Sequence, residues 1–394
     1  MAGWADILAW LALAVVAAIV LAAVARRRRD GLIFFLSGFF AIALLPTSNL
    51  LFQTGSIMAE RFLYLPSVAF AIAVVALAGR LGRERLAATV LAAVVALFAC
   101  RTFARNFDWK DDLTLSAADV RVVPASFKLH GILADALLKQ DPRHNIGTVI
   151  EEAETAWNVL RLLPPELIFR QPPSNLGAYY RAKGDFTGGA GTADGRAWYQ
   201  KSLAVLLKGR DADRVAERVF DEAMRAHGKP LTGRLRFPTL YLNLGLTYAR
   251  LGRNVEALEA YRQGRGADPS MLDFYDAIAA VYLAGGNPEG AAVTLAEKTQ
   301  VDGNRPATIA ALRDVYAKIP GGSCAIVEHG GAPMLDMACP RLRDDLCLAW
   351  ADLTQTLVEA RKSSQARSVK KSATERYGCP AAPFQAVLPD GPVF

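Results

Sequence analysis

The apolar residues of this 394-residue chain are concentrated in long runs near its N-terminus. Four such runs stand at about 4–25, 32–46, 62–79 and 86–103. Because a membrane-spanning helix needs roughly 20 mostly apolar residues, each run is a candidate span. After residue 103 the composition changes to that of a water-soluble protein. The pattern therefore predicts a membrane domain at 1–103 with four transmembrane helices, followed by a soluble region.

The arginines between these runs predict how the chain is oriented. No basic segment precedes the first run, and arginines at 26–29 follow it where a signal peptide would have a small-residue cleavage site, so we expect a retained span. The loop between the third and fourth spans holds Arg80, Arg83 and Arg85. Arginine-rich loops stay in the cytoplasm, which places the soluble region on the non-cytoplasmic side, in a periplasm or lumen. Because these arginines are explained as topology signals, the net charge of +7 does not predict a nucleic-acid partner.

The soluble region repeats itself every 34 residues, as shown by Tyr248, Tyr282 and Tyr316. This spacing, with small residues and aromatics at fixed positions, is typical of tetratricopeptide helix pairs. We expect 104–320 to hold a linker and repeats at about 127–165, 170–208, 238–271, 272–305 and 306–320. The predicted fold is therefore all-α: four transmembrane helices, a tetratricopeptide solenoid and a Cys-containing tail.

Stacked helix pairs form a superhelix whose concave surface binds an extended peptide or a partner's helix. The tyrosines at repeat-consensus positions are interpreted as core residues. Polar residues at non-consensus positions of the first helices are the peptide-binding candidates: Asn243, Thr247 and Asp276.

Four cysteines cluster in the tail at 321–394, namely Cys324, Cys339, Cys347 and Cys379. An even number in one segment predicts two disulfides in an oxidising compartment, with three connectivities open. A zinc site is the alternative, but the tail has no CxxC spacing and no paired histidines. We therefore predict disulfides and no metal.

Other candidates for chemistry are weak. The pair Asp111 and Asp112 could serve acid–base or metal chemistry, but such a pair more often caps a helix start. The four histidines share no ligand spacing, and no phosphate loop, nucleophile elbow or HExxH motif occurs.

The loop after the second span carries adjacent charges, Glu60 and Arg61, at a membrane edge, where ionisable residues usually have a function. This loop and its flanks, PTSNLLFQTGSIMAERFLYLPS at 46–67, resemble a signature of the transmembrane and tetratricopeptide-repeat (TMTC) O-mannosyltransferases. The matching residues are Pro46, Ser48, Asn49, Leu50, Phe52, Gly55, Ala59, Glu60, Arg61, Leu63, Tyr64, Leu65, Pro66 and Ser67. After the last span, the family's entry into the first repeat is matched by Arg101, Arg105, Asn106 and Trp109.

The resemblance implies a glycosyltransferase of the GT-C fold that takes mannose from a dolichyl-phosphate donor, although no cofactor is evident from the motifs themselves. The family's catalytic acids lie in a loop upstream of the matching segment, so none can be assigned here. Glu60 and Arg61 carry over only as membrane-interface residues. Arg61 could bind a lipid-linked phosphate, because guanidinium matches phosphate in a bidentate fashion. The alternative is a local ion pair with Glu60.

Two functions follow. The favoured one is the C-terminal membrane and repeat portion of a TMTC-like protein O-glycosyltransferase, whose repeats bind acceptor or partner proteins outside the cytoplasm. A separate catalytic membrane subunit could be one further partner. The alternative is a non-enzymatic membrane-anchored repeat scaffold for protein–protein interaction.

Overall fold

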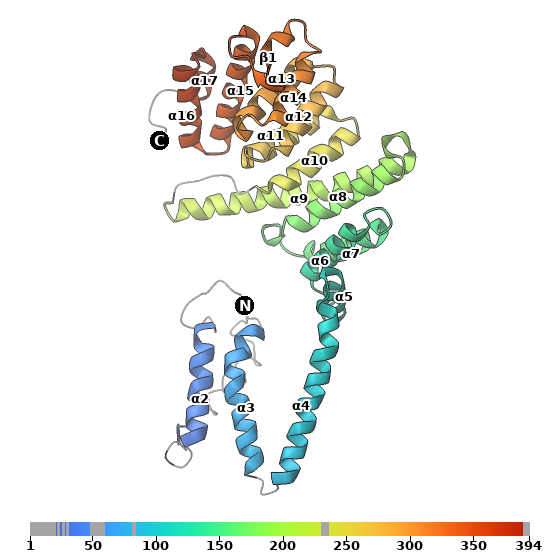
Figure 1. Ribbon diagram of the computed structural model, residues 1–394, viewed down its shortest axis with the longest axis vertical. Coiled ribbons are helices and arrows are strands. Elements are labelled where there is room, and N and C mark those ends of the chain that lie inside the picture. The colour runs from blue at the N-terminus through green and yellow to red at the C-terminus, as the bar shows by residue number, and fades with distance from the viewer. Residues whose placement is uncertain are drawn as a thin grey trace. The chain divides into compact units, whose positions relative to one another are not determined.

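A computed structural model describes residues 31–47, 60–80, 84–229 and 236–388, with isolated positions at 21, 24, 25 and 28. The chain divides into two compact units, Met1–Phe107 and Asp108–Phe394. Figure 1 shows that both consist almost entirely of helices.

The described part of the first unit holds three apolar helices, α2 (Gly31–Leu44), α3 (Tyr64–Gly79) and α4 (Glu84–Asn106). Short 3₁₀ turns follow α2 (η1, Leu45–Thr47) and precede α3 (η2, Glu60–Leu63). Large apolar side chains are exposed on all three helices; Phe35, Phe70 and Leu97 are 64%, 68% and 69% exposed. Such surfaces are unfavourable in water and suit a hydrocarbon environment.

One helix among the described residues, Arg85–Trp109, is long and apolar enough to cross a membrane. Helices α2 and α3 are apolar but shorter. The predicted span at 4–25 lies almost wholly outside the described residues. The structure thus supports one clear membrane helix, and the four-span arrangement remains a prediction.

The second unit begins with η3 (Phe107–Trp109) and α5 (Asp112–Val122). Asp111 caps α5, because its carboxylate accepts the Thr114 backbone N–H at 2.8 Å while the Thr114 side chain accepts the Asp111 N–H at 3.2 Å. This confirms the capping interpretation of the Asp111–Asp112 pair. These hydrogen bonds, led by the backbone N–H of Thr114, hold the pKa of Asp111 below its usual value.

The repeats follow as antiparallel helix pairs, drawn in green to orange in Figure 1. The pairs are α6 (Phe127–Gln140) with α7 (Ile146–Leu160), α8 (Gln171–Phe186) with α9 (Ala193–Ala226), α10 (Pro238–Arg250) with α11 (Asn254–Ala267), and α12 (Asp273–Ala284) with α13 (Pro288–Asp302). Two short turns, η4 (Pro165–Leu167) and η5 (Gly189–Gly191), precede α8 and α9. A last first helix, α14 (Pro306–Tyr316), follows α13.

Close approach of helices within and between these pairs depends on small residues opposite aromatic ones. A Cβ added at Gly245 of α10 would lie 2.3 Å from the ring of Tyr261 on α11, and one at Gly264 would lie 2.3 Å from Phe274 on α12. Tyr241 and Tyr261 are both buried, which confirms that consensus tyrosines belong to the core. Dense packing of this kind leaves no room for a larger residue at either glycine.

Helix α9 is far longer than the other repeat helices and extends beyond them (Figure 1). Its extension carries carboxylates at every fourth residue, Asp213, Glu217 and Asp221, which share one helix face. Each accepts an arginine from a different segment: Arg170 before α8, Arg236 before α10 and Arg361 after α15, respectively. This acidic ladder joins segments that are distant in the sequence.

The C-terminal cap follows α14 and starts with η6 (Gly322–Ala325) and an antiparallel hairpin, β1 (Ile326–His329) with β2 (Ala332–Leu335). It continues with α15 (Pro340–Glu359), α16 (Ser363–Lys371), the π-helical turn η7 (Ser372–Arg376) and α17 (Ala382–Val387). The all-α prediction therefore holds except for this hairpin. The chain reverses between β1 and β2 at Gly330 and Gly331, which both have positive φ, a conformation that glycine adopts readily. Pairing of the two strands satisfies the backbone hydrogen-bonding groups on either side of this turn.

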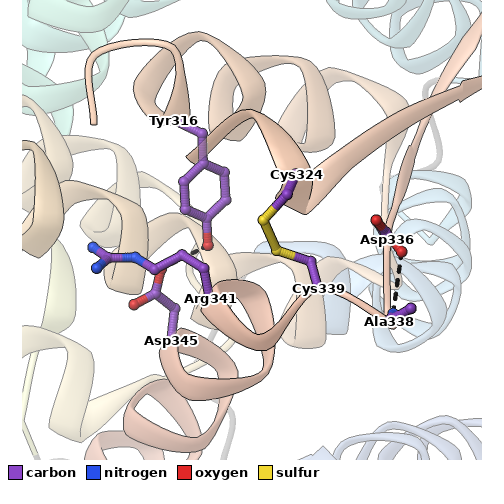
Figure 2. The surroundings of a disulfide bond; sticks show 7 residues. All are labelled: Tyr316, Cys324, Asp336, Ala338, Cys339, Arg341 and Asp345. Carbon is purple, nitrogen blue, oxygen red and sulfur yellow. Dashed lines mark hydrogen bonds and ion pairs between the residues drawn. A yellow bond between two sulfur atoms is a disulfide. The ribbon is translucent and has the colours of Figure 1, made fainter. Parts of the chain in front are cut away.

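The four clustered cysteines pair as Cys324–Cys339 and Cys347–Cys379, with Cα separations of 5.7 and 5.5 Å. Figure 2 shows the first disulfide beside Tyr316, whose hydroxyl donates to the Asp345 carboxylate at 2.7 Å. Burial and this hydrogen bond raise the pKa of Tyr316. The first bridge ties η6 to the start of α15, and the second ties the middle of α15 to the segment before α17.

Candidate peptide-binding site

Two of the three sequence-predicted binding residues lie inside the solenoid. The Asn243 side-chain amide donates to the carbonyl and hydroxyl of Ser174 on α8, at 3.3 and 3.1 Å. Thr247 is fully buried, and its hydroxyl lies 2.9 Å from that of Ser202 on α9. Both residues therefore brace neighbouring helices, and neither is presented to a peptide.

The third candidate, Asp276 on α12, is exposed, but its carboxylate already accepts two hydrogen bonds from Lys298 at 2.6 and 2.8 Å. It belongs to a different repeat from Asn243 and Thr247. The three residues do not share a site.

Glu60 and Arg61 form the first residues of η2. Their side chains lie outside the part of the chain that the structure describes. The ion-pair and lipid-phosphate interpretations of these residues stay predictions.

The structure instead places a pocket of about 780 Å³ between the first helices of the first two repeats. One wall is a single face of α6, and the opposite wall is a face of α8. The turn η4 with the residues after it closes one side, α7 supplies the floor, and Phe237 reaches in from before α10. The lining residues are Phe127, Lys128, Gly131, Ile132, Asp135, Ala153, Ala156, Glu166, Leu167, Ile168, Phe169, Arg170, Gln171, Pro172, Asn175, Tyr179 and Phe237.

Most of the pocket wall is apolar, and much of it is open to solvent. Ile132, Leu167 and Phe169 are 50%, 59% and 53% exposed. The rings of Phe127 and Phe169 stack obliquely with their centroids 5.1 Å apart. A cluster of large apolar side chains at the mouth of a pocket is typical of an interaction site.

A few polar groups punctuate this wall. The Tyr179 hydroxyl donates to the Asp135 carboxylate across the gap between α8 and α6. Burial raises the pKa of Tyr179, and the hydrogen bond to Asp135 adds to the rise, so the hydroxyl stays protonated and remains a donor. The Lys128 ammonium lies over the Phe169 ring, 5.7 Å from its centroid. Arg170 forms an ion pair with the buried Asp213 at 3.1 Å.

One segment of the sequence could have indicated this pocket, although its polar residues alone do not. The segment 161–173, RLLPPELIFRQPP, combines prolines, which cannot continue a helix, with large apolar residues in a surface turn. Its Leu162, Leu167 and Phe169 are all more than half exposed. An apolar turn of this kind, placed between two repeats, marks an unpartnered surface.

Comparisons with known proteins fit this architecture. No family model matches the chain. Protein O-mannosyl-transferase TMTC3 of Mus musculus is 22% identical over 280 residues, covering 62% of this chain and 28% of its own length. Protein O-mannosyl-transferase F38B6.6 of Caenorhabditis elegans is 31% identical over 128 residues, and Tmtc2 of Drosophila melanogaster is 33% identical over 120. The resemblance to the TMTC O-mannosyl-transferases is confirmed.

The similarity is partial in extent. The chain spans only about 28% of the mouse relative's length, and 17% and 13% of the worm and fly relatives. Among solved structures, a thermophilic tetratricopeptide protein of Thermus thermophilus aligns with 57% of this chain at 18% identity and a TM-score of 0.38. That structural likeness is too low to support a conclusion, so the repeat assignment rests on the helix pairs themselves.

Proposed function

We propose that this chain is the membrane-anchored repeat portion of a TMTC-like protein, and that its repeats bind an extended segment of another protein outside the cytoplasm. The apolar pocket between α6 and α8 is the observation that carries the proposal. A peptide is the ligand favoured by tetratricopeptide solenoids, whose first helices present a continuous surface. The chain's similarity to protein O-mannosyl-transferases supports an acceptor for glycosylation as the bound segment.

The exposed rim explains why a peptide would bind. Ile132, Leu167 and Phe169 each keep half or more of their surface in water. A peptide that covers these side chains removes them from water, which favours binding by roughly 25 cal/mol per Å² of apolar surface buried. The rim comes from a helix and a turn that are packed in advance, so little conformational entropy is lost on binding.

In this proposal the sugar donor is a polyprenyl- or dolichyl-phosphate sugar at the membrane surface, near Glu60 and Arg61. Its support is the sequence match at 46–67. A separate catalytic membrane subunit is one further partner in this proposal. The repeats would then hold the acceptor on the same side as the donor.

The pocket is tested by photo-crosslinking in cells. A photoreactive phenylalanine analogue replaces Ile132 in the full chain, and the same analogue replaces Leu348 as a control, because Leu348 is 55% exposed on α15. We expect discrete protein adducts from position 132 and none above background from position 348. Equal adducts at both positions, or none at 132, would overturn the peptide-binding proposal.

The location is tested separately with a reporter fused after Phe394. A reporter enzyme that works only in an oxidising, non-cytoplasmic compartment should be active, and its cytoplasmic counterpart should be silent. Activity of the cytoplasmic reporter would reverse the proposed topology.

A non-enzymatic scaffold is the second candidate, because relatives that carry the enzyme name extend far beyond the matched region. The purified chain, given a polyprenyl-phosphate mannose donor and peptides, is expected to transfer no sugar by itself. Mannose on the proteins crosslinked at position 132 would favour the transferase portion, and its absence would favour the scaffold. Turnover by the isolated chain would contradict both forms, and Asp111 and Asp112 would be the first acids to replace.

A further inference from the structure

We infer that the pocket between α6 and α8 selects a segment in which a large apolar side chain is followed or preceded by a lysine or arginine. This inference rests on the proposed peptide binding and adds its specificity. It combines two features of the pocket: an apolar cavity among phenylalanines, and a carboxylate at its far end with room for one more partner.

The apolar feature comes from a contrast between floor and walls. The floor residues Ala153 and Ala156 are buried and have the smallest side chains that α7 can offer there. The walls carry Phe127, Phe169 and Phe237. Small residues beside large rings leave a volume that accommodates an aromatic or long aliphatic side chain, and aromatic neighbours favour oblique ring contacts.

The charged feature depends on which charged side chains of the lining already have partners within the protein. Arg170 is held by Asp213, a fully buried carboxylate that also accepts the Tyr241 hydroxyl at 3.1 Å. Lys128 lies over the Phe169 ring. The two basic side chains of the lining are therefore engaged with the protein itself.

The two carboxylates of the lining are less fully engaged. Asp135 accepts the Tyr179 hydroxyl through Oδ1, and within the described residues no cation pairs with it or with Glu166 on η4. A carboxylate accepts several hydrogen bonds at once. A basic residue of a bound segment would therefore meet acceptors, and an acidic one would meet repulsion.

Helical geometry separates the two ends of the pocket. Lys128 and Asp135 stand seven residues apart on α6, which is two turns and about 10 Å of helix rise. The phenylalanine stack lies at the Lys128 end, because Phe169 contacts both Phe127 and Lys128. The apolar anchor and the basic anchor of the segment would thus lie about three residues apart along an extended chain, which advances at most about 3.5 Å per residue.

The test uses the full chain purified in detergent and a randomised short-peptide library displayed on phage. We expect enrichment of peptides with an aromatic or large aliphatic residue within three positions of a lysine or arginine. A selected peptide should bind Asp135→Asn at least tenfold more weakly than it binds the native chain. The asparagine Oδ1 still accepts the Tyr179 hydroxyl, so the variant should fold. Asp194→Asn, at the exposed start of α9, is the matched control and should bind normally.

A second measurement separates charge from general damage. The lysine or arginine of the selected peptide is replaced by norleucine, which keeps an apolar side chain and removes the charge. The native chain and Asp135→Asn should then bind this peptide equally well. Enrichment of acidic peptides, or a tenfold loss in Asp135→Asn that persists with norleucine, would overturn the inference. Peptides that compete with crosslinking at position 132 without any charge preference would overturn the specificity and leave peptide binding intact; no peptide binding at all would overturn both.

Discussion

Charged side chains are paired differently in the pocket between α6 and α8 and at the contact between the C-terminal cap and the last repeats. In the pocket, large apolar residues such as Phe169 are exposed, and the carboxylate of Asp135 has capacity for another partner. Where the cap meets the repeats, Arg265 of α11 is 3% exposed and pairs with Glu297 on α13 and Asp352 on α15. Two disulfides hold the cap as well. The difference fits the proposal that the pocket receives a ligand, whereas the contact between the cap and the repeats stays closed.

The centre of the closed region is an ionic cluster of one arginine and two acids. Arg265 donates to Glu297 at 2.7 Å and to Asp352 at 2.6 Å, and it also donates to the Thr356 hydroxyl at 3.1 Å. Because Glu297 is buried with Arg265, the cluster depends on correct geometry more than on its charges alone. It joins the cap to the last repeats.

The largest expected effect is therefore the loss of this arginine. Arg265→Met keeps an unbranched side chain but leaves Glu297, Asp352 and Thr356 without the hydrogen bonds that the guanidinium donates, which should lower the free energy of unfolding by about 3–5 kcal/mol. Hydrogen exchange of the full chain should show faster exchange in α11, α13 and α15. Arg262→Met, on the exposed side of the same helix, is the control. Equal exchange in the two variants would contradict the role of the cluster.

The second disulfide should have the next largest effect. Replacing Cys347 and Cys379 together by alanine removes a link across 32 residues and should destabilise the cap by about 2–4 kcal/mol. The loss should be confined to α16 and α17, with the pocket unchanged. Non-reducing mass spectrometry of the native chain should identify Cys324–Cys339 and Cys347–Cys379. Four free thiols, or another connectivity, would refute the pairing.

The sequence predicted what depends on short-range spacing. Tyr241, Gly245 and Tyr261 lie within one repeat, so their periodicity is enough to place them in its core. The partners of the α9 carboxylates could not be predicted, because Asp221 and Arg361 are 140 residues apart and only the stacked solenoid brings them together. The pocket was missed for the same reason, since its walls come from five separate segments.

Polarity also misled the choice of binding residues. Asn243 and Thr247 are polar at positions where a peptide contact was expected, but they satisfy hydrogen bonds of neighbouring helices. A buried polar side chain and an exposed one look alike in a sequence. Only their partners, Ser174 and Ser202, distinguish them, and those partners come from the preceding repeat.

Loss of the ion pair between Asp221 of the acidic ladder and Arg361 of the cap should have a moderate effect on stability. Arg361 donates to both Asp221 oxygens, at 2.7 and 2.6 Å, and holds a positive φ of 59°. Arg361→Ala should lose about 1–2 kcal/mol, because a charge-assisted bidentate pair is removed from a partly buried site. Arg361→Gly should lose less, because glycine adopts a positive φ without strain. Thermal melts check both, with Arg367→Ala on α16 as control; a glycine variant weaker than the alanine variant would contradict the strain argument.

A smaller effect is expected from the titration of Glu297. Burial raises the pKa of Glu297 to about 8, and the attraction of Arg265 offsets only part of this rise. The folded chain thus binds this proton more tightly than the unfolded chain, so the stabilisation is complete below about pH 4.5 and is lost as pH rises toward 8. Glu297→Gln should flatten the fall in melting temperature between pH 5 and 9. Parallel pH curves for the two chains would contradict the raised pKa.

The smallest effect on stability should come from replacing a residue of the pocket itself. Phe169 is 53% exposed and its ring contacts Phe127, so Phe169→Ser should lower the free energy of unfolding by only about 1 kcal/mol. The same change removes a wall of the cavity and should reduce crosslinking from position 132 at least fivefold. Leu348→Ser, at an equally exposed position of the cap, should alter neither quantity. A residue that contributes little to folding and much to binding is what an open site requires, whereas Phe169→Ser with unchanged crosslinking would make the exposed ring an ordinary surface residue.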